Sequence, residues 1–315
     1  MAKGIEAIDL RRQRNEGCQR CENQEERSQR SGDGICRATE STLDGLPLRC
    51  VGEWCFDKIH RLVKYFGIFA QAMKGAWGGH VYYIEICSGP GRCSTRDGWE
   101  QDGTALAVLR DRRFANVERA QFFDNDPEAV KVLQRRIDAL GQAHKAQALV
   151  GDYNDPASIL KRIDETCSRG LYLILVDPTR CDVPFKTITA LKNGLNSVDF
   201  LVNVALGTDF NRCARQVVLD RGFAETRDRY ERFLGAEGFL AGPDVMAACD
   251  RPEALRRLFA RRYLESMRGI GLEYADTKPV RQYYYLLFAS GDARGLEFWR
   301  KACKYDPSGQ GTLDL

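Results

Sequence analysis

Apolar and polar positions follow two alternating periods along most of the chain. Short apolar runs predict strands, and they are HVYYIEIC (80–87), RAQFFD (119–124), KAQALVGD (145–152), LYLILVDP (171–178), VDFLVNVA (198–205) and QYYYLLFAS (282–290). Segments with helical spacing of apolar residues lie around them, at 53–73, 104–111, 127–140, 156–167, 185–195 and 295–304. The repeated strand–helix order predicts an α/β fold with a doubly wound, mostly parallel sheet and helices on both faces.

Two segments depart from this alternation. Residues 1–50 are polar and predict an N-terminal extension, which precedes an α/β domain at 51–315. The pattern from about residue 212 to residue 268 predicts a helical, Arg-rich insertion before the last strand. A helical wheel of its final segment separates an apolar from a basic side; the apolar side holds Leu255, Leu258, Phe259 and Tyr263, and the basic side holds Arg257, Arg261 and Arg268.

Composition and charge limit the classes of function. No apolar run approaches the roughly 18 residues that a membrane helix needs, and the N-terminus lacks the apolar core of a signal peptide. We therefore expect a cytoplasmic protein with no membrane partner. The formal net charge of +3 is too small to indicate nucleic-acid binding by itself. The basic side of the insertion could contact nucleic-acid phosphates, or it could be an ordinary solvated helix face.

The first predicted strand breaks into Cys-Ser-Gly-Pro-Gly at 87–91, which we call the glycine turn. Such turns approach nucleotides closely at the carboxyl end of the first strand of a doubly wound sheet. A dinucleotide fingerprint requires a third glycine where this chain has Ser94, and an acid about 20 residues further on, well before Asp124. A P-loop requires a Gly-Lys-Ser/Thr sequence that does not follow the turn.

S-adenosylmethionine fits the strand ends better. Its methionine part would lie over the glycine turn, its ribose hydroxyls on Asp124 at the end of the second strand, and its adenine beyond the third strand. The residues predicted to hold this cofactor are Glu85, Cys87, Ser88, Gly89, Pro90, Gly91, Asp124, Asn125, Asp152 and Tyr153. Two alternatives remain: Asp124 as a helix cap, for which Asp126 is better placed, and Asp152 as an Asx-turn residue.

This pattern resembles the class I methyltransferase fold, a Rossmann-like seven-stranded sheet, over residues of about 80–290. Further motifs resemble the three-Cys-motif partner (TcmP) family over about 40–305; they are LDGLPLRCVGEW, YIEICSGPGR, DGTALA, GDYND, VDPTR, GTDFNR and YYYLLFAS. The family is taken as methyltransferase-like and is paired with a protein whose three-cysteine motif is reminiscent of radical-SAM enzymes. The resemblance implies such a partner. It also adds Arg92 to the cofactor residues and Asp209 and Arg212 to the catalytic ones.

The fourth strand end predicts where a methyl acceptor would lie. Asp177-Pro178 is similar to the Asp/Asn-Pro-Pro-aromatic motif of enzymes that methylate exocyclic amines, but Thr179 and Arg180 replace its last two residues. Arg180 could instead bind a carboxylate or phosphate, and Asp177 could be a buried structural acid. We expect N-methylation of a nucleic acid or nucleotide-like substrate. The alternative is a non-catalytic, S-adenosylmethionine-binding or regulatory partner of a three-Cys-motif protein.

Twelve cysteines are many for such a chain, and four of them lie in the polar extension. Cys18-x-x-Cys21, Cys36 and Cys50 could hold one tetrahedral zinc ion, which would stabilise a segment without its own core. Only one C-x-x-C pair is present, so a redox pair, free thiols or an iron–sulfur cluster remain alternatives. Cys55 is a substitute ligand.

Overall fold

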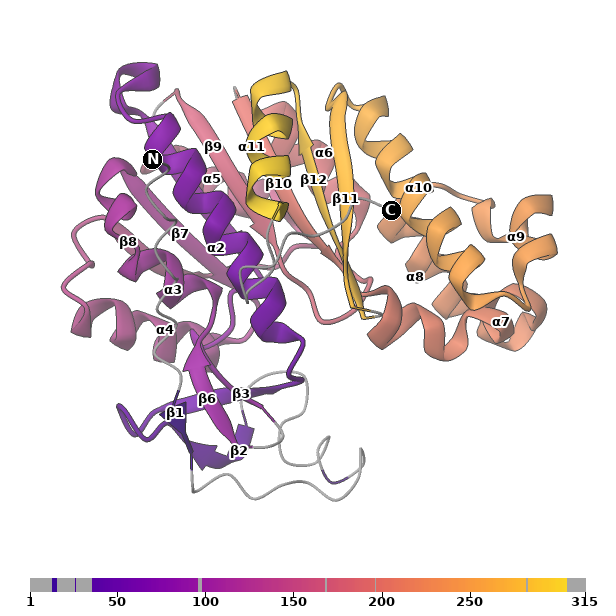
Figure 1. The fold of residues 1–315 in the computed structure, drawn as a ribbon, viewed down its shortest axis with the longest axis horizontal. Coiled ribbons are helices and arrows are strands. Elements are labelled where there is room, and N and C mark those ends of the chain that lie inside the picture. Colours follow the sequence, from indigo (N-terminus) through magenta and orange to yellow (C-terminus); the bar gives the residue numbers. More distant parts are fainter. Residues whose placement is uncertain are drawn as a thin grey trace.

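The main sheet has seven strands, in the order β11-β12-β10-β9-β4-β7-β8 (Figure 1). The computed structural model describes residues 13–15, 26, 36–95, 98–167, 169–195, 197–281 and 283–304. The strands are β4 (Val81–Ile86), β7 (Arg119–Asp124), β8 (Ala146–Val150), β9 (Leu171–Val176), β10 (Ser197–Val204), β11 (Tyr274–Val280) and β12 (Tyr284–Ser290). β12 runs antiparallel to both neighbours, whereas the first five strands pair in parallel. The predicted fold class is confirmed.

The strand order places the glycine turn at the switch point of the sheet. Numbered along the chain, the strands run 3-2-1-4-5-7-6, so the first five have the order of doubly wound nucleotide-binding folds. The order reverses at β4, which has β7 on one side and β9 on the other. A ligand is therefore expected beyond the carboxyl end of β4.

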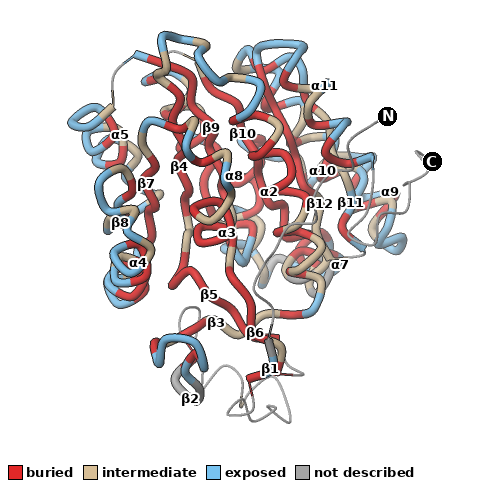
Figure 2. Tube along the Cα trace, turned by 60° about the vertical axis from the view of Figure 1, so that its left-hand side comes forward, coloured by how far each residue is buried: buried red, intermediate tan, exposed pale blue. Residues whose placement is uncertain are grey.

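Helices cover both faces of the sheet, as predicted. One face carries α2 (Cys55–Ala72), α3 (Thr104–Arg110), α4 (Pro127–Ala139) and α11 (Ala293–Cys303). The other carries α5 (Pro156–Asp164), α6 (Phe185–Gly194) and the insertion helices α8 (Ala224–Leu234) and α10 (Pro252–Gly269). Because both faces are covered, the central strands are buried along their length, which explains their continuous apolar runs (Figure 2).

The predicted insertion is present and helical. It starts after the short π-helix η3 (Leu206–Phe210) and comprises α7 (Asn211–Leu219), η4 (Arg221–Phe223), α8, η5 (Phe239–Ala241), α9 (Pro243–Ala248) and α10. The helical wheel of α10 is confirmed, because Leu255, Phe259 and Tyr263 are buried while its predicted basic side chains are exposed. Arg257 lies 3.6 Å from Glu253 one turn away, as on an ordinary solvated helix face.

A second, smaller sheet lies at the carboxyl edge of the main sheet (Figures 1 and 2). Its order is β1-β6-β5-β3-β2, from β1 (Gln13–Arg14), β2 (Cys36–Glu40), β3 (Pro47–Val51), β5 (Arg92–Thr95) and β6 (Trp99–Asp102). The β5–β6 hairpin leaves directly from the glycine turn, and β3 pairs with β5 in parallel. The domain boundary expected between residues 50 and 51 falls inside β3.

A buried ion network holds the small sheet together. Arg92 is 2% exposed, and its guanidinium donates to Glu100 (2.7 Å) and Asp102 (2.5 Å). Glu100 also accepts hydrogen bonds from Ser41 and from the Thr42 backbone, which tie it to the N-terminal segment. The described residues of the two hairpin strands are polar in sequence, yet all but Trp99 are buried, because the charged groups are paired with one another.

Arg136 of α4 fastens the small sheet to the glycine turn. Its guanidinium donates to both carboxylate oxygens of Asp44, at 2.8 and 2.9 Å. It also donates to the carbonyl oxygens of Leu46 (3.1 Å), Pro47 (2.9 Å) and Pro90 (2.6 Å). These bonds use all five donors of a guanidinium whose side chain is 3% exposed.

No helix in the described ranges is long and apolar enough to span a bilayer.

Replacing Arg136 with alanine should cost about 3–5 kcal/mol of unfolding free energy, because it leaves Asp44 and three carbonyls without their buried donor. Urea denaturation of the purified variant measures this. The neighbouring Arg135 is exposed, so Arg135→Ala is the matched control and should change stability by less than about 0.5 kcal/mol. Equal effects of the two substitutions would contradict the assigned role.

Candidate functional site

The glycine turn has three residues in the left-handed backbone region. Cys87 has φ 66°, Gly89 has φ 61° and Gly91 has φ 87°. A side chain at Gly91 would meet Leu133 at 2.7 Å and Leu106 at 3.1 Å, so this glycine lets α3 and α4 pack. A Cβ at Gly89 would find no heavy atom nearer than the Arg49 guanidinium at 3.5 Å. Gly89 is therefore the glycine that faces the site. Cys87 holds a conformation unfavourable for a side chain, as residues at functional sites often do.

Asp124, at the end of β7, holds the turn in place. Its carboxylate accepts from the Gly89 backbone N–H at 2.7 Å and from the Asp126 N–H at 3.0 Å. The cap of α4 is Asp126, whose side chain accepts from the Glu128 N–H. The capping alternative for Asp124 is therefore wrong. Its carboxylate lies beside the glycine turn and has further lone pairs with which it can accept hydrogen bonds from a ligand.

Carboxylates dominate the electrostatics of the turn. Burial raises the pKa of the Cys87 thiol well above its usual value, and Asp124, Asp182 and Asp177 raise it further. Arg49, from β3 of the small sheet, acts in the opposite direction. Three carboxylates and one guanidinium thus act on the turn, and of the carboxylates Asp177 is paired with the Lys58 ammonium. Asp124 and Asp182 are the carboxylates here that form no ion pair with a lysine or arginine of the described residues, and they favour a ligand that carries positive charge.

Asp177 lies beyond the end of β9 in a small polar cluster. The Lys58 amino group of α2 donates to both of its carboxylate oxygens, at 2.7 and 2.8 Å, and the Asn203 amide of β10 donates at 2.9 Å. Burial alone would lower the pKa of Lys58, but the Asp177 carboxylate outweighs it and raises that pKa. Asp177 is therefore held in one orientation, with its side chain 13% exposed.

Sequence reasoning missed Lys58 and Asn203. Lys58 sits on the buried face of an amphipathic helix, where a lysine needs a partner. A lysine on the apolar face of a helix is therefore the sequence signal from which a buried ion pair could have been predicted. Asn203 had a similar signal, because it interrupts the apolar run of β10 near its carboxyl end.

Glu85 is buried behind the turn rather than in it. It is 1% exposed and accepts a hydrogen bond from the Tyr83 hydroxyl at 2.8 Å. Burial raises its pKa well above the usual value, and Asp177 adds to this, so the site favours the neutral carboxyl group. Direct contact of Glu85 with a cofactor, as predicted, does not fit this placement.

The two residues predicted to hold the adenine beyond the third strand, Asp152 and Tyr153, have different environments. Asp152 accepts from the backbone and side-chain nitrogens of Asn154 at 2.8 and 2.9 Å, so the Asx-turn alternative is confirmed. Tyr153 is half-buried, and its pKa is raised by burial and by the carboxylate of its hydrogen-bond partner Asp182. Asn125 is exposed beside Asp124. Ser88 is half-buried within the glycine turn, and its hydroxyl has no hydrogen-bond partner among the described residues.

Several residues taken from the family resemblance have structural partners. Asp209 accepts from Arg229 twice (2.7 and 3.0 Å), from the Tyr230 hydroxyl (3.1 Å) and from the Cys181 N–H (2.8 Å). It fastens α8 to the segment after β9, so its predicted catalytic role does not fit. The Arg92 guanidinium is paired with carboxylates of the small sheet, and its predicted cofactor contact does not fit either.

The remaining residues predicted for catalysis differ in their exposure to solvent. Pro178 is buried and Arg180 is exposed, whereas the side chain of Arg212 lies outside the described residues.

The structure describes two of the four cysteines that were predicted to bind zinc. Cys18 and Cys21 lie outside the described residues, while Cys36 is buried in β2 and Cys50 is half-buried in β3. Within the described ranges, no three His, Cys, Asp or Glu side chains gather as metal ligands. The substitute ligand Cys55 contacts the Cys93 thiol, and this hydrogen bond lowers the pKa of Cys55. The zinc site stays a prediction.

Neither a family model nor a curated protein matches the sequence. Among solved structures, similar chains include an O-methyltransferase from Bacillus cereus in complex with SAH, at 12% identity over 71% of this chain and 80% of that chain, TM-score 0.36. The O-methyltransferase TomG from Streptomyces achromogenes, in complex with SAM, has 15% identity over 73% and 79%, TM-score 0.40. A B. subtilis tRNA methyltransferase, TrmK, has 10% identity over 71% and 65%, TM-score 0.36. The fold assignment rests on the strand order itself.

Breaking the Lys58–Asp177 pair from one side should destabilise the protein. Lys58→Met leaves a buried carboxylate without its cation and should cost about 3 kcal/mol or more in urea denaturation. Adding Asp177→Asn should recover about 1–3 kcal/mol relative to the sum of the two single changes. Lys74→Met, at an exposed position, is the control. Additive costs of the two substitutions would show that the two groups do not interact.

Glu85→Gln should change the pH dependence of stability. A carboxyl group with a raised folded-state pKa stabilises the fold below its unfolded pKa of about 4.3, and this contribution is lost as the pH rises through the folded value. The wild type should therefore lose stability relative to Glu85→Gln as the pH rises above about 4.3. Urea denaturation across pH measures this, with the exposed Glu237→Gln as control. A constant difference between wild type and Glu85→Gln would contradict a neutral Glu85.

Proposed function

We propose that the protein is an S-adenosylmethionine-dependent methyltransferase. The observation that carries this is the Asp124 carboxylate, which binds the Gly89 N–H of the glycine turn at 2.7 Å, with further carboxylates acting on the same turn. S-adenosylmethionine carries a sulfonium and an ammonium group against one carboxylate, so a negative site favours it. A dinucleotide brings two phosphates, which the same carboxylates repel.

The backbone after the turn supports the same choice. Pyrophosphate groups bind where the glycine turn opens directly into a helix N-terminus. Here the chain continues from Gly91 into strand β5, and α3 starts only at Thr104, after the β5–β6 hairpin. The site therefore lacks the directly following helix that a dinucleotide uses.

The described residues suggest how the cofactor would be held. The Asp124 carboxylate would accept from the ribose hydroxyls, and Arg49, beside Gly89, would bind the methionyl carboxylate. When bound, the cofactor supplies an electrophilic methyl group. No protein nucleophile is needed, so the chain's task is to align an acceptor with that methyl group.

Asp177 is the proposed acceptor-positioning residue. Lys58 and Asn203 fix its orientation, so its carboxylate can accept a hydrogen bond from an acceptor amine and direct the lone pair of that amine. We propose a nitrogen on a nucleic acid or nucleotide-like substrate. The exposed arginines of α10 and the exposed Arg180, three residues after Asp177, support an anionic substrate.

The resemblance to the TcmP family extends this proposal. It adds a three-Cys-motif protein as partner and a cytoplasmic location. The four cysteines Cys18, Cys21, Cys36 and Cys50 would bind zinc. These points rest on the sequence alone.

Calorimetric titration tests the cofactor. S-adenosylmethionine should bind the wild type, whereas NAD should not. Asp124→Asn removes the charge at the ribose position and should weaken binding about tenfold or more, equivalent to about 1.4 kcal/mol. Asp126→Asn, two residues away at the helix cap, is the matched control and should leave the affinity unchanged.

Absence of S-adenosylmethionine binding by the folded wild type would refute the proposal. Preferential binding of NAD would do the same, because it would show that the carboxylates do not exclude phosphate groups. Equal affinity of the wild type and Asp124→Asn would refute the ribose contact.

A further inference from the structure

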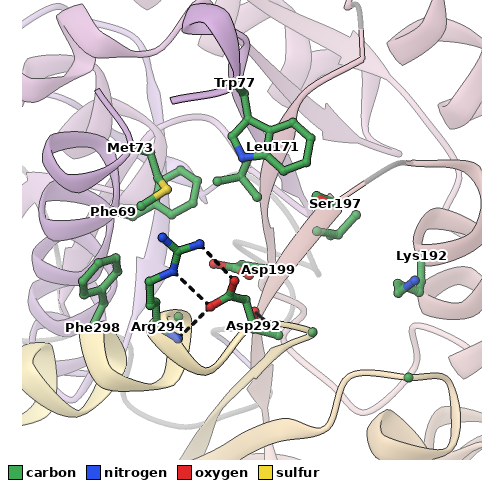
Figure 3. A pocket seen from close by; sticks show the side chains of 15 residues that line it. Phe69, Met73, Trp77, Leu171, Lys192, Ser197, Asp199, Asp292, Arg294 and Phe298 are labelled. Atoms are coloured by element: carbon green, nitrogen blue, oxygen red, sulfur yellow. Dashed lines mark hydrogen bonds and ion pairs between the residues drawn. The ribbon is translucent and has the colours of Figure 1, made fainter. Parts of the chain in front are cut away.

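A cavity of about 310 Å³ opens at the end of the main sheet opposite the glycine turn (Figure 3). It is formed by the last turns of α2, the first residues of β9 and β10, the last residue of β12 and the start of α11. Since these are the amino ends of the parallel strands, the cavity is separate from the proposed methyltransferase site and does not depend on that proposal.

One side of the cavity is apolar and aromatic. This side is formed by Phe69 of α2, Met73 directly after that helix, Phe298 of α11 and Leu171 of β9, and Trp77 lies above them (Figure 3). Trp77 is 44% exposed and has a left-handed backbone, φ 56°, within a turn of several left-handed glycines. An exposed indole held in an unfavourable conformation at a cavity mouth resembles a stacking surface for a flat ligand.

The floor of the cavity carries a buried carboxylate, Asp199 of β10. It is 7% exposed and accepts from the Tyr65 hydroxyl at 3.0 Å and from the Ser290 hydroxyl, both neutral donors. No lysine or arginine of the described ranges forms an ion pair with it. The charged group that acts on it is another carboxylate, Asp292, and the Arg294 guanidinium is paired with Asp292 rather than with Asp199.

This arrangement has a specific electrostatic consequence. Burial raises the pKa of Asp199 to about 6, so most of it is ionised at neutral pH although no cation balances it. A buried anion without a counter-ion is costly, and a cation that enters the cavity would relieve that cost. The two hydrogen bonds that Asp199 accepts leave lone pairs for such a ligand.

We propose that this cavity binds a small flat organic cation, an aromatic or heteroaromatic ring that carries a protonated amine or amidinium. The ring packs against Trp77 and Phe69, and the cationic group donates to Asp199. The volume lies at the lower end of the range of about 300–1,000 Å³ for ligand pockets, which suits one or two rings. Lys192 and Arg294 on the rim disfavour larger polycations.

Benzamidine is the probe that tests this, with benzamide as its neutral isostere. Binding to the purified full-length protein is measured by calorimetry and by the change in tryptophan fluorescence. Saturable binding of benzamidine, at least about tenfold tighter than that of benzamide, is expected. Asp199→Asn keeps an acceptor for Tyr65 and Ser290 but removes the charge, and it should abolish this preference.

Two further variants locate the site. Trp77→Ala changes an exposed side chain, so it should fold, and it should weaken benzamidine binding about threefold or more and remove most of the fluorescence change. Asp250→Asn removes an exposed carboxylate in the insertion and should bind benzamidine like the wild type. Equal binding of benzamidine and benzamide, or unchanged binding by Trp77→Ala and Asp199→Asn, would overturn the proposal. So would an absence of saturable binding.

Discussion

The five hydrogen bonds of Arg136 are the constraint on which the architecture of the site depends. A buried guanidinium must satisfy all its donors, and here Arg136 on α4 finds its acceptors in two other parts of the chain, the segment 44–47 and the glycine turn. The N-terminal sheet is thereby fixed on the carboxyl edge of the main sheet. It is part of the site and not an appendage, because its strand β3 places Arg49 over Gly89.

This placement determines the charge balance at the turn. The main sheet contributes the carboxylates Asp124 and Asp177, while the cations Arg49 and Lys58 come from the elements that precede β4. A zwitterionic, cation-bearing ligand suits this division better than a pyrophosphate. The same elements also connect the two ends of the sheet. α2 carries Lys58 toward the turn and Tyr65 toward the cavity, and β10 carries Asn203 toward the turn and Asp199 toward the cavity.

Patterns that depend on apolar burial could be predicted from the sequence. The six strands with apolar runs and the helix faces such as that of α10 follow directly from periodicity. β11 was not located, because YADTKPV is polar and contains a proline. The β5–β6 hairpin was missed for a related reason: the pairing of Arg92 with Glu100 and Asp102 lets a charged segment be buried, and pairing over such distances leaves no periodic signal.

The site shows the same division between local and long-range information. The helix cap at Asp126 and the Asx turn at Asp152 are local features, and both could be considered from the sequence. Lys58 lies 119 positions from Asp177 in the chain, and only the fold brings them together. Asp209 was expected in catalysis, but its partners on α8 could not be inferred from its neighbours in sequence.

A crystal structure of the protein grown with S-adenosylmethionine tests the central claim most directly, namely that the glycine turn and the N-terminal sheet together form one cofactor site. The ribose hydroxyls are expected within hydrogen-bond distance of Asp124 and the methionyl carboxylate beside Arg49. Cofactor bound away from Gly89, or contacting the turn without any residue of the N-terminal sheet, would contradict it.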